Sequence, residues 1–215
     1  MNHAHMPNCW TMFEKEEGSA STSDNATFKL VVRCLAPIAA GEEITISYLD
    51  PGQPRAELLQ KLHDQYFIAQ DADVGAMPHL GNPDELRRIG AKALYSCEEG
   101  EDTDHDDDAG SILPRVARVL ARAMQDAEWD TVLTCCEDSL CLWKVIHRYP
   151  FHPKVGIWMM TAGLACLKSG KNMETARAHL DKAVKILGIT HGKFHHVTNS
   201  AKETLALVSQ LTGKT

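Results

Sequence analysis

The sequence lacks the cysteine spacings that mark metal or redox sites, because none of its seven cysteines belongs to a C-x-x-C pair. The cysteines are odd in number and scattered: Cys9, Cys34, Cys97, Cys135, Cys136, Cys141 and Cys166. No secretory signal peptide accompanies them, so a disulfide framework is not expected. This pattern predicts an intracellular protein, in the cytoplasm, the nucleus or both.

Long apolar runs and basic clusters are also missing. No apolar stretch approaches the roughly 20 residues that cross a bilayer, so no membrane association is predicted. Direct nucleic-acid binding is not expected either, because no Lys/Arg cluster could neutralise a row of phosphates. The net charge of -7 comes largely from one acidic run, residues 98–108, which is predicted to be a solvated linker. The chain is 44% hydrophobic and 24% charged over 215 residues, which suits one large or two small globular domains.

The first part of the chain has β character. Residues 27–34 are rich in β-branched side chains and predict a strand, and the acidic, Gly- and Ser-containing stretch 14–25 before them predicts a loop. In residues 43–48 apolar and polar side chains alternate, which predicts a half-buried strand that ends before Pro51.

Helical patterns take over beyond this segment. A first helix is expected from Pro54 to about Tyr66, and a second from Asn82, a cap followed by proline, to about Ser96. Apolar periodicity predicts further helices at 111–124, about 128–147, 153–168, 173–187 and 195–211, with Gly170 and Gly188 at turns or C-caps. The last two-thirds of the chain should therefore form helical hairpins.

One predicted hairpin has the small residues of a helical repeat. Two helices could approach closely at Gly163, Ala165, Ala176, Leu180 and Ala183, as in tetratricopeptide-like repeats. An ordinary helical hairpin is the alternative interpretation.

Two strings near the start resemble a known family. Residues 2–8, NHAHMPN, are similar to the N-H-S-C-x-P-N motif of SET-domain methyltransferases. Residues 33–50 resemble the second SET signature, R-x-x-x-x-I-x-x-G-E-E-I-T-I-x-Y, in the expected order and spacing. The tail adds HPxVG at 152–156 and ITHGxxH at 189–195. Together these motifs resemble the C-terminal part of the SET-and-MYND-type protein-lysine methyltransferases.

The resemblance implies roles for particular residues. Asn2, through its amide, and His3, largely through its backbone, would hold S-adenosylmethionine. Tyr48 would orient the amine of a substrate lysine for in-line methyl transfer, and Tyr66 would be a second aromatic of the lysine channel. Ile68 stands where the family has a phenylalanine against the cofactor. In isolation each has a plainer interpretation: Asn2 as a turn residue, His3 as an exposed side chain and Tyr48 as a core tyrosine whose hydroxyl reaches the surface.

The zinc ligands of the family are altered. The first ligand position is His5, which could bind a metal, but the three clustered positions correspond to Gln70, Ala72 and Gly75, which cannot form a tetrahedral site. A substitute site would have to draw on His5, Cys9, His63 or Asp71, each more simply a surface or turn residue. No structural zinc is therefore expected.

These observations predict an α+β fold, with a partial, mainly antiparallel SET β segment followed by a TPR-like helical array. The expected domains are a C-terminal part of a SET domain at 1–76, a helix with the acidic linker at 77–110 and a helical-repeat domain at 111–215. The chain begins at the first motif, so we expect the early SET strands and the MYND zinc module to be missing.

Three functions are compatible with these residues. The first is S-adenosylmethionine-dependent methylation of a lysine in a protein substrate, incomplete in this chain. The second is a noncatalytic helical module that binds a partner peptide. The third, a cysteine enzyme around Cys135, Cys136 and Cys141, competes with the simpler interpretation that these are packing residues of one helix.

Overall fold

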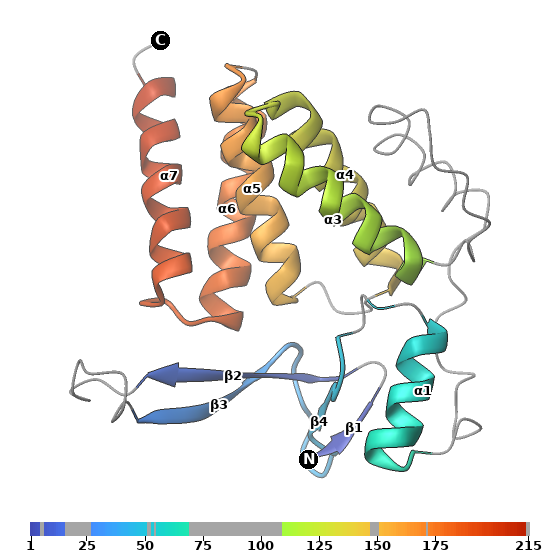
Figure 1. Cartoon of the computed structure of the whole chain (residues 1–215). Helices are drawn as coiled ribbons and strands as arrows, with labels where there is room; N and C mark the ends of the chain where they lie inside the picture. The colour runs from blue at the N-terminus through green and yellow to red at the C-terminus, as the bar shows by residue number, and fades with distance from the viewer. Residues whose placement is uncertain are drawn as a thin grey trace, which may run out of the picture.

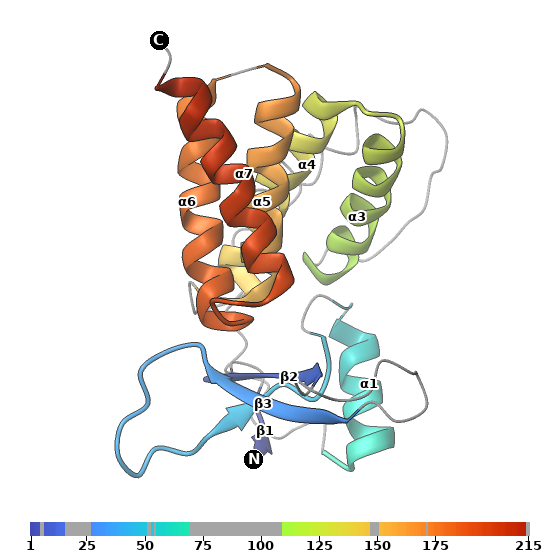
Figure 2. The same cartoon turned by 90° about the vertical axis from the view of Figure 1, so that its left-hand side faces the viewer.

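The computed structural model describes residues 1–4, 7–15, 27–50, 53, 55–68, 109–146, 151–170 and 172–213. Within these ranges a few short strands come first and helices follow, which confirms the predicted α+β fold (Figure 1). The strands and helix α1 lie below the lower ends of the other helices in two views related by a quarter turn (Figures 1 and 2).

The strands form two small sheets. Their bounds are β1 Asn2–His3, β2 Cys9–Lys15, β3 Phe28–Cys34 and β4 Thr45–Ile46. β2 pairs with β3 in antiparallel register, and β1 pairs with β4 in parallel. The strand expected at 27–34 is confirmed, whereas the one expected at 43–48 is reduced to the two residues of β4. Strand β2 was not predicted, and it includes Glu14 and Lys15, which the sequence assigned to a loop.

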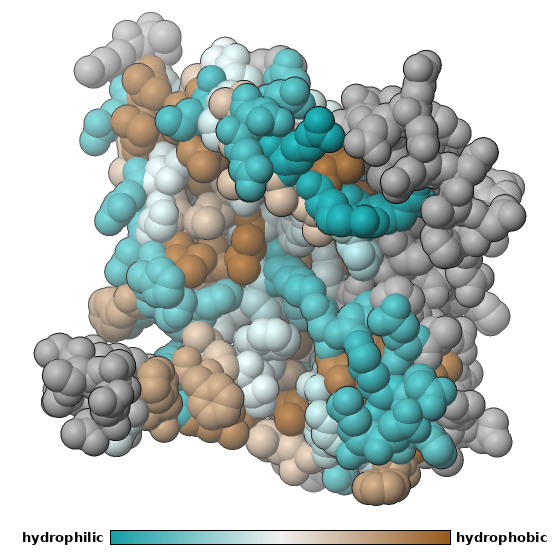
Figure 3. All heavy atoms as spheres, viewed as in Figure 1, coloured by the Kyte–Doolittle hydropathy of each residue, from teal (hydrophilic) through white to brown (hydrophobic). Residues whose placement is uncertain are grey.

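The β2–β3 ribbon has two unlike faces, because side chains alternate along a strand. Trp10 on one face contacts a buried histidine at the start of α5, so this face meets the helices. The other face carries Phe13, opposite Leu30, and Phe28, and their side chains are 72%, 53% and 62% exposed. Apolar residues accordingly gather over the ribbon in the space-filling view (Figure 3).

The helices largely follow the predicted ranges. They are α1 Arg55–Tyr66, α3 Ala109–Gln125, α4 Trp129–Ile146, α5 Pro153–Lys168, α6 Met173–Thr190 and α7 His196–Thr212. Gly170 follows α5 in the left-handed region at φ 66°, as predicted for a turn. Gly188 lies inside α6, so its prediction as a turn or C-cap was wrong, and the helix ends at the C-cap His191 instead. The helix expected at 82–96 and the acidic run lie outside the described residues.

Helices α3 to α7 form an array in which each helix packs on the next. Four apolar clusters fill it, with fully buried members such as Val116, Val132, Leu180 and Leu187. The predicted close approach within the hairpin is confirmed: a Cβ on Gly163 would lie 2.5 Å from Leu180 Cγ. The tetratricopeptide-like character of the array stays a prediction, as do the domain boundaries, which fall at or next to the undescribed residues 69–108.

Candidate functional site

Asn8 joins the two sequence segments that carry the SET-like motifs. Its buried side chain accepts a hydrogen bond from the Thr45 backbone N–H at 2.9 Å and donates one to the Glu43 carbonyl at 2.8 Å. The Asn8 backbone N–H donates in turn to Thr45 Oγ1 at 3.2 Å. An asparagine amide holds a donor and an acceptor side by side, so it can pair with two backbone groups as a neighbouring strand would. We call this arrangement the Asn8 clamp.

The parallel pairing of β1 with β4 continues the junction. Asn2 lies opposite Thr45 and His3 opposite Ile46, and the Ala4 N–H donates to the Ile46 carbonyl at 3.0 Å. The two segments are therefore fixed side by side although about 40 residues separate them in the chain.

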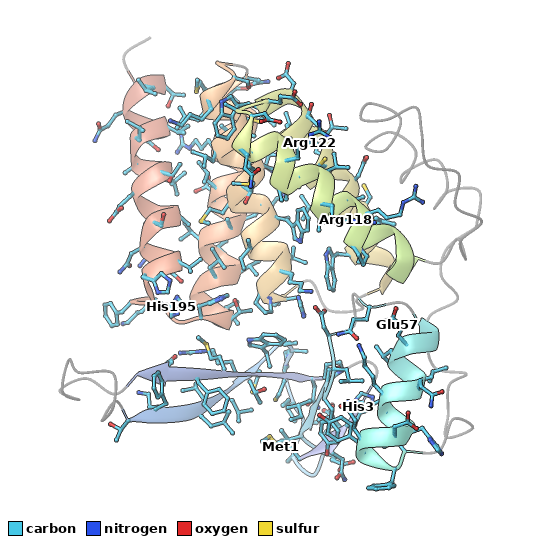
Figure 4. The ribbon with its side chains drawn as sticks, viewed as in Figure 1. Met1, His3, Glu57, Arg118, Arg122 and His195 are labelled. Atoms are coloured by element: carbon cyan, nitrogen blue, oxygen red, sulfur yellow. The ribbon has the colours of Figure 1, made fainter. Side chains whose placement is uncertain are left out.

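Three of the predicted site residues form a row of rings. The His3 and Tyr48 ring centroids are 5.3 Å apart, and those of Tyr48 and Tyr66 are 4.8 Å apart. His3 Nδ1 accepts a hydrogen bond from the Tyr48 backbone N–H at 3.2 Å, so Nδ1 carries no proton in this contact. The Tyr48 hydroxyl donates to the Met1 carbonyl at 3.1 Å. Figure 4 shows Met1 and His3 close together, with His3 next to α1.

Tyr66 reaches the row from α1, which ends at that residue. Phe67 adopts the left-handed region at φ 56° and its N–H donates to the His63 carbonyl at 3.0 Å, which closes the helix. Leu58 and Leu62 anchor the helix through their buried side chains, whereas Tyr66 remains 41% exposed.

The two remaining predicted residues lie beside this row. The exposed Asn2 donates from Nδ2 to Glu43 Oε1 at 2.6 Å. Ile68 is half-buried just beyond α1, and its N–H donates to the Leu62 carbonyl at 3.2 Å. The catalytic, cofactor and channel roles of Asn2, His3, Tyr48, Tyr66 and Ile68 stay predictions.

The first tail motif connects the helices to the β segment. His152 is buried, caps α5 by accepting from the Lys154 N–H at 3.2 Å, and stacks on Trp143 with ring centroids 5.0 Å apart. Trp10 of β2 also contacts this imidazole edge-on, with ring centroids 5.3 Å apart. Lys154 also forms an ion pair with Asp50, just after the second SET-like string.

The second tail motif meets the other end of the ribbon. Arg33 of β3 bonds Glu14 at 2.6 Å, which lowers the pKa of Glu14, and its guanidinium lies against Gly192, where a Cβ would be only 2.7 Å away. The neighbouring imidazoles of His191 and His195 have ring centroids 4.9 Å apart. Burial first, and then the charges of His195 and Arg33, lower the pKa of His191 to about 4. Figure 4 places His195 at the lower end of α7, above the ribbon.

Sequence reasoning missed what Asn8, Arg33 and His152 do. Each belonged to a recognised motif, but the motif did not predict that these residues join the two SET-like segments to each other or the β segment to the helices. For His152 the signal was present, since a polar residue before Pro153 is typical of a helix N-cap. For Asn8 and Arg33 the partners are distant in sequence, so no local pattern could identify them.

Two of the three cysteines of α4 are packing residues. Cys135 and Cys136 are fully buried, and burial raises the pKa of the Cys136 thiol far above its usual range. Cys141 is exposed, so its interpretation as a packing residue was wrong. A thiol held protonated is a poor nucleophile, which argues against a cysteine enzyme here.

Metal and membrane features can be assessed for the described residues only. Among them no group of three or more His, Cys, Asp or Glu side chains could hold a metal ion. His5, Gln70, Asp71, Ala72 and Gly75 lie outside these ranges, so the expectation about zinc stays a prediction. No helix in the described part of the chain is long and apolar enough to span a bilayer.

Comparison with known proteins supports the motifs. Residues 1–49 match the SET domain family. The chain is 24% identical to the human protein "Histone-lysine N-methyltransferase SMYD1" over 236 aligned residues, which cover 92% of this chain and 47% of that protein. The chain thus spans about half the length of this relative, and the match extends through both the β segment and the helical array.

Proposed function

Because this chain is related to the SET-and-MYND-type SET proteins over most of its length, we propose that its β segment supplies part of a site for S-adenosylmethionine-dependent methylation of a lysine in a protein substrate. The observation that carries the proposal is the Asn8 clamp with the β1–β4 pairing, which joins two distant motifs. The proposal places this activity inside the cell, in the cytoplasm or nucleus.

The residues present fit this cofactor chemically. When bound, S-adenosylmethionine supplies the methyl group from a sulfonium cation, and aromatic faces favour such a cation. The row His3, Tyr48 and Tyr66 offers these faces at spacings of 5.3 and 4.8 Å. Asn2 is exposed, and one hydrogen bond to Glu43 leaves its amide with further donor and acceptor capacity for a ligand. Ile68 would cover an apolar part of the ligand.

The Tyr48 hydroxyl is suited to orient a neutral amine. Its single hydrogen is donated to the Met1 carbonyl, so its oxygen can only accept from an incoming amine N–H. An amine that donates to Tyr48 keeps its lone pair directed elsewhere, and alignment of that lone pair is what methyl transfer mainly requires.

The proposal is tested by calorimetric titration of the purified chain with S-adenosylmethionine, followed by transfer of labelled methyl to a lysine-containing peptide. We expect saturable binding that Asn2→Ala weakens about tenfold, the effect of about 1.4 kcal/mol for one lost hydrogen bond. Tyr48→Phe should leave binding within about twofold and lower the transfer rate by roughly 10²-fold or more.

Asn199→Ala is the matched control, since the side chain of this half-buried asparagine of α7 donates to a local backbone carbonyl, that of Phe194. It should change neither binding nor transfer. A folded chain that gives no heat with S-adenosylmethionine would contradict the proposal.

A second candidate function is a noncatalytic module that binds a lysine-containing partner peptide. The complete apolar core of helices α3 to α7 favours it, because this array can hold a binding surface independently of the β segment. Two results together would support this alternative. The chain would not bind S-adenosylmethionine, and its binding of the peptide would be unaffected by Asn2→Ala and Tyr48→Phe.

A further inference from the structure

Cys9 and Cys34 face each other across the β2–β3 ribbon. The strand register places them directly opposite, so both side chains project from the same face of the sheet. A backbone hydrogen bond runs from the Leu35 N–H to the Asn8 carbonyl at 2.8 Å, one residue outside the pair on each strand. This identifies a non-hydrogen-bonded pair, the type in which the two Cα atoms lie about 4.5 Å apart and the side chains are closest.

That spacing suits a disulfide. Bridged cysteines have Cα atoms about 4.4–6.8 Å apart, so no backbone movement is needed to bring the sulfurs into bonding range. The two thiols are close enough for Cys34 to contribute to the raised pKa of the Cys9 thiol. From this geometry we infer that Cys9 and Cys34 form a reversible disulfide when the protein meets a small-molecule disulfide oxidant.

The two thiols differ in access, which sets the order of the chemistry. Cys34 is exposed, whereas Cys9 is only 1% exposed. Burial, with the neighbouring Cys34, raises the pKa of the Cys9 thiol to about 11, so Cys9 stays protonated while Cys34 is accessible to solvent.

The reaction balances with one small disulfide and two protein thiols. The Cys34 thiolate attacks one sulfur of the oxidant, forms a mixed disulfide and releases one small thiolate. That thiolate takes the Cys9 proton, and the Cys9 sulfur then attacks the Cys34 sulfur and displaces the second small thiolate, which is protonated by water. Two electrons pass from the protein sulfurs to the oxidant, giving one protein disulfide and two small thiols.

The other cysteines in the described ranges do not offer this arrangement. Cys135 and Cys136 are adjacent on one helix and fully buried, as is Cys166. Cys141 is exposed but is not paired with another cysteine across a sheet, which makes it a suitable reference thiol.

The disulfide would act on the Asn8 clamp, because Asn8 precedes Cys9 and its carbonyl already bonds Leu35, which follows Cys34. Cross-linking at this point would hold β2 and β3 together next to the clamp and so stiffen the junction with Glu43 and Thr45. This inference stands whether or not the chain binds S-adenosylmethionine.

The test is oxidation of the native full chain with oxidised glutathione, then trypsin digestion and mass spectrometry without reductant. Cleavage after Lys15, Arg33 and Arg55 leaves Cys9 alone in peptide 1–15 and Cys34 alone in peptide 34–55. We expect these two peptides joined, at least tenfold above any other cysteine pair, and released by dithiothreitol.

Variants separate the two steps. Cys9→Ser should stop at the glutathione mixed disulfide on Cys34, and Cys34→Ser should give no joined peptide, whereas Cys141→Ser should leave the joined peptide unchanged. A second measurement needs no variant: in urea the preference of the wild-type chain for this pair should disappear. Native wild-type protein that accumulates glutathione on Cys34 without joining Cys9 would overturn the inference.

Discussion

The buried apolar clusters of this protein lie in helices α3 to α7, whereas the β2–β3 ribbon exposes large apolar side chains on one face. The array is stabilised by its own core. The β segment is joined by specific side-chain contacts: the Asn8 clamp within it, and His152 and Arg33 at its contact with the helices. The geometry of the candidate site is therefore set by few, specific contacts, and stability measured for the whole chain reports mainly on the helices.

Removal of the same side chain from each region should expose this difference most strongly. Leu180→Ala creates a cavity between α5 and α6 and should lower the free energy of unfolding by about 2–5 kcal/mol. Leu30→Ala trims a side chain that is 53% exposed and should change it by no more than about 0.5 kcal/mol. Urea denaturation followed by circular dichroism measures both, and equal losses would show that the ribbon face is covered in solution.

A substitution at the clamp should loosen the β segment and leave the array intact. Asn8→Ala removes the partner of the Thr45 N–H and of the Glu43 carbonyl, at a cost of about 1–3 kcal/mol. Amide hydrogen exchange should therefore accelerate at Thr45 while α5 and α6 keep their protection. Asn2→Ala, which removes one exposed contact, is the control, and acceleration throughout the helices would contradict the division into two regions.

Acidification should weaken the contact between the two regions by a smaller amount. The pKa of His191 is lowered to about 4 from the ordinary value of 6.5. Below pH 6.5, therefore, His191 becomes protonated in the unfolded chain while it stays unprotonated in the folded chain. The His191 contribution is complete above pH 6.5 and is lost as the pH falls towards about 4, because a protonated His191 would be partly buried and would lie near His195 and Arg33. Thermal melting across this range should show a flatter dependence for His191→Gln than for wild type, whereas Gln210→Ala, an exposed change in α7 that removes no titratable group, should keep the wild-type slope.

The helices were predictable because their signals are local. Apolar periodicity and the residues His152 and Pro153 determine where α5 begins, and the small residues opposite Leu180 predicted the close helix pair. The prediction of a turn or C-cap at Gly188 was wrong because α6 continues beyond it to Thr190. Nothing lies within 4 Å of the position where a Cβ would be, so no packing contact depends on a side chain here.

The β segment was less predictable because its partners are distant. Strand β2 shows no simple alternation: Trp10 and Met12 face the helices, while Phe13 on the other face is also apolar but exposed. Within the part of the chain that the structure describes, β4 pairs over two residues, with Asn2 and His3. Separate roles for His3, Tyr48 and Tyr66 were implied by family resemblance, but their arrangement as a row of rings was not predicted, and the Asn8 clamp beside it depends on hydrogen bonds between residues more than 30 positions apart.

The contact between the Arg33 guanidinium and Gly192 limits how the β2–β3 ribbon and the helical tail can be recombined with other sequences. Gly192 adopts φ 99°, and any side chain there would meet the guanidinium at 2.7 Å. A chimera that grafted a different helical tail onto this ribbon would need to supply a glycine at this corner, because replacing Arg33 would not relieve the positive φ. Engineering of the ribbon or of the tail therefore has to take the other part into account at this corner.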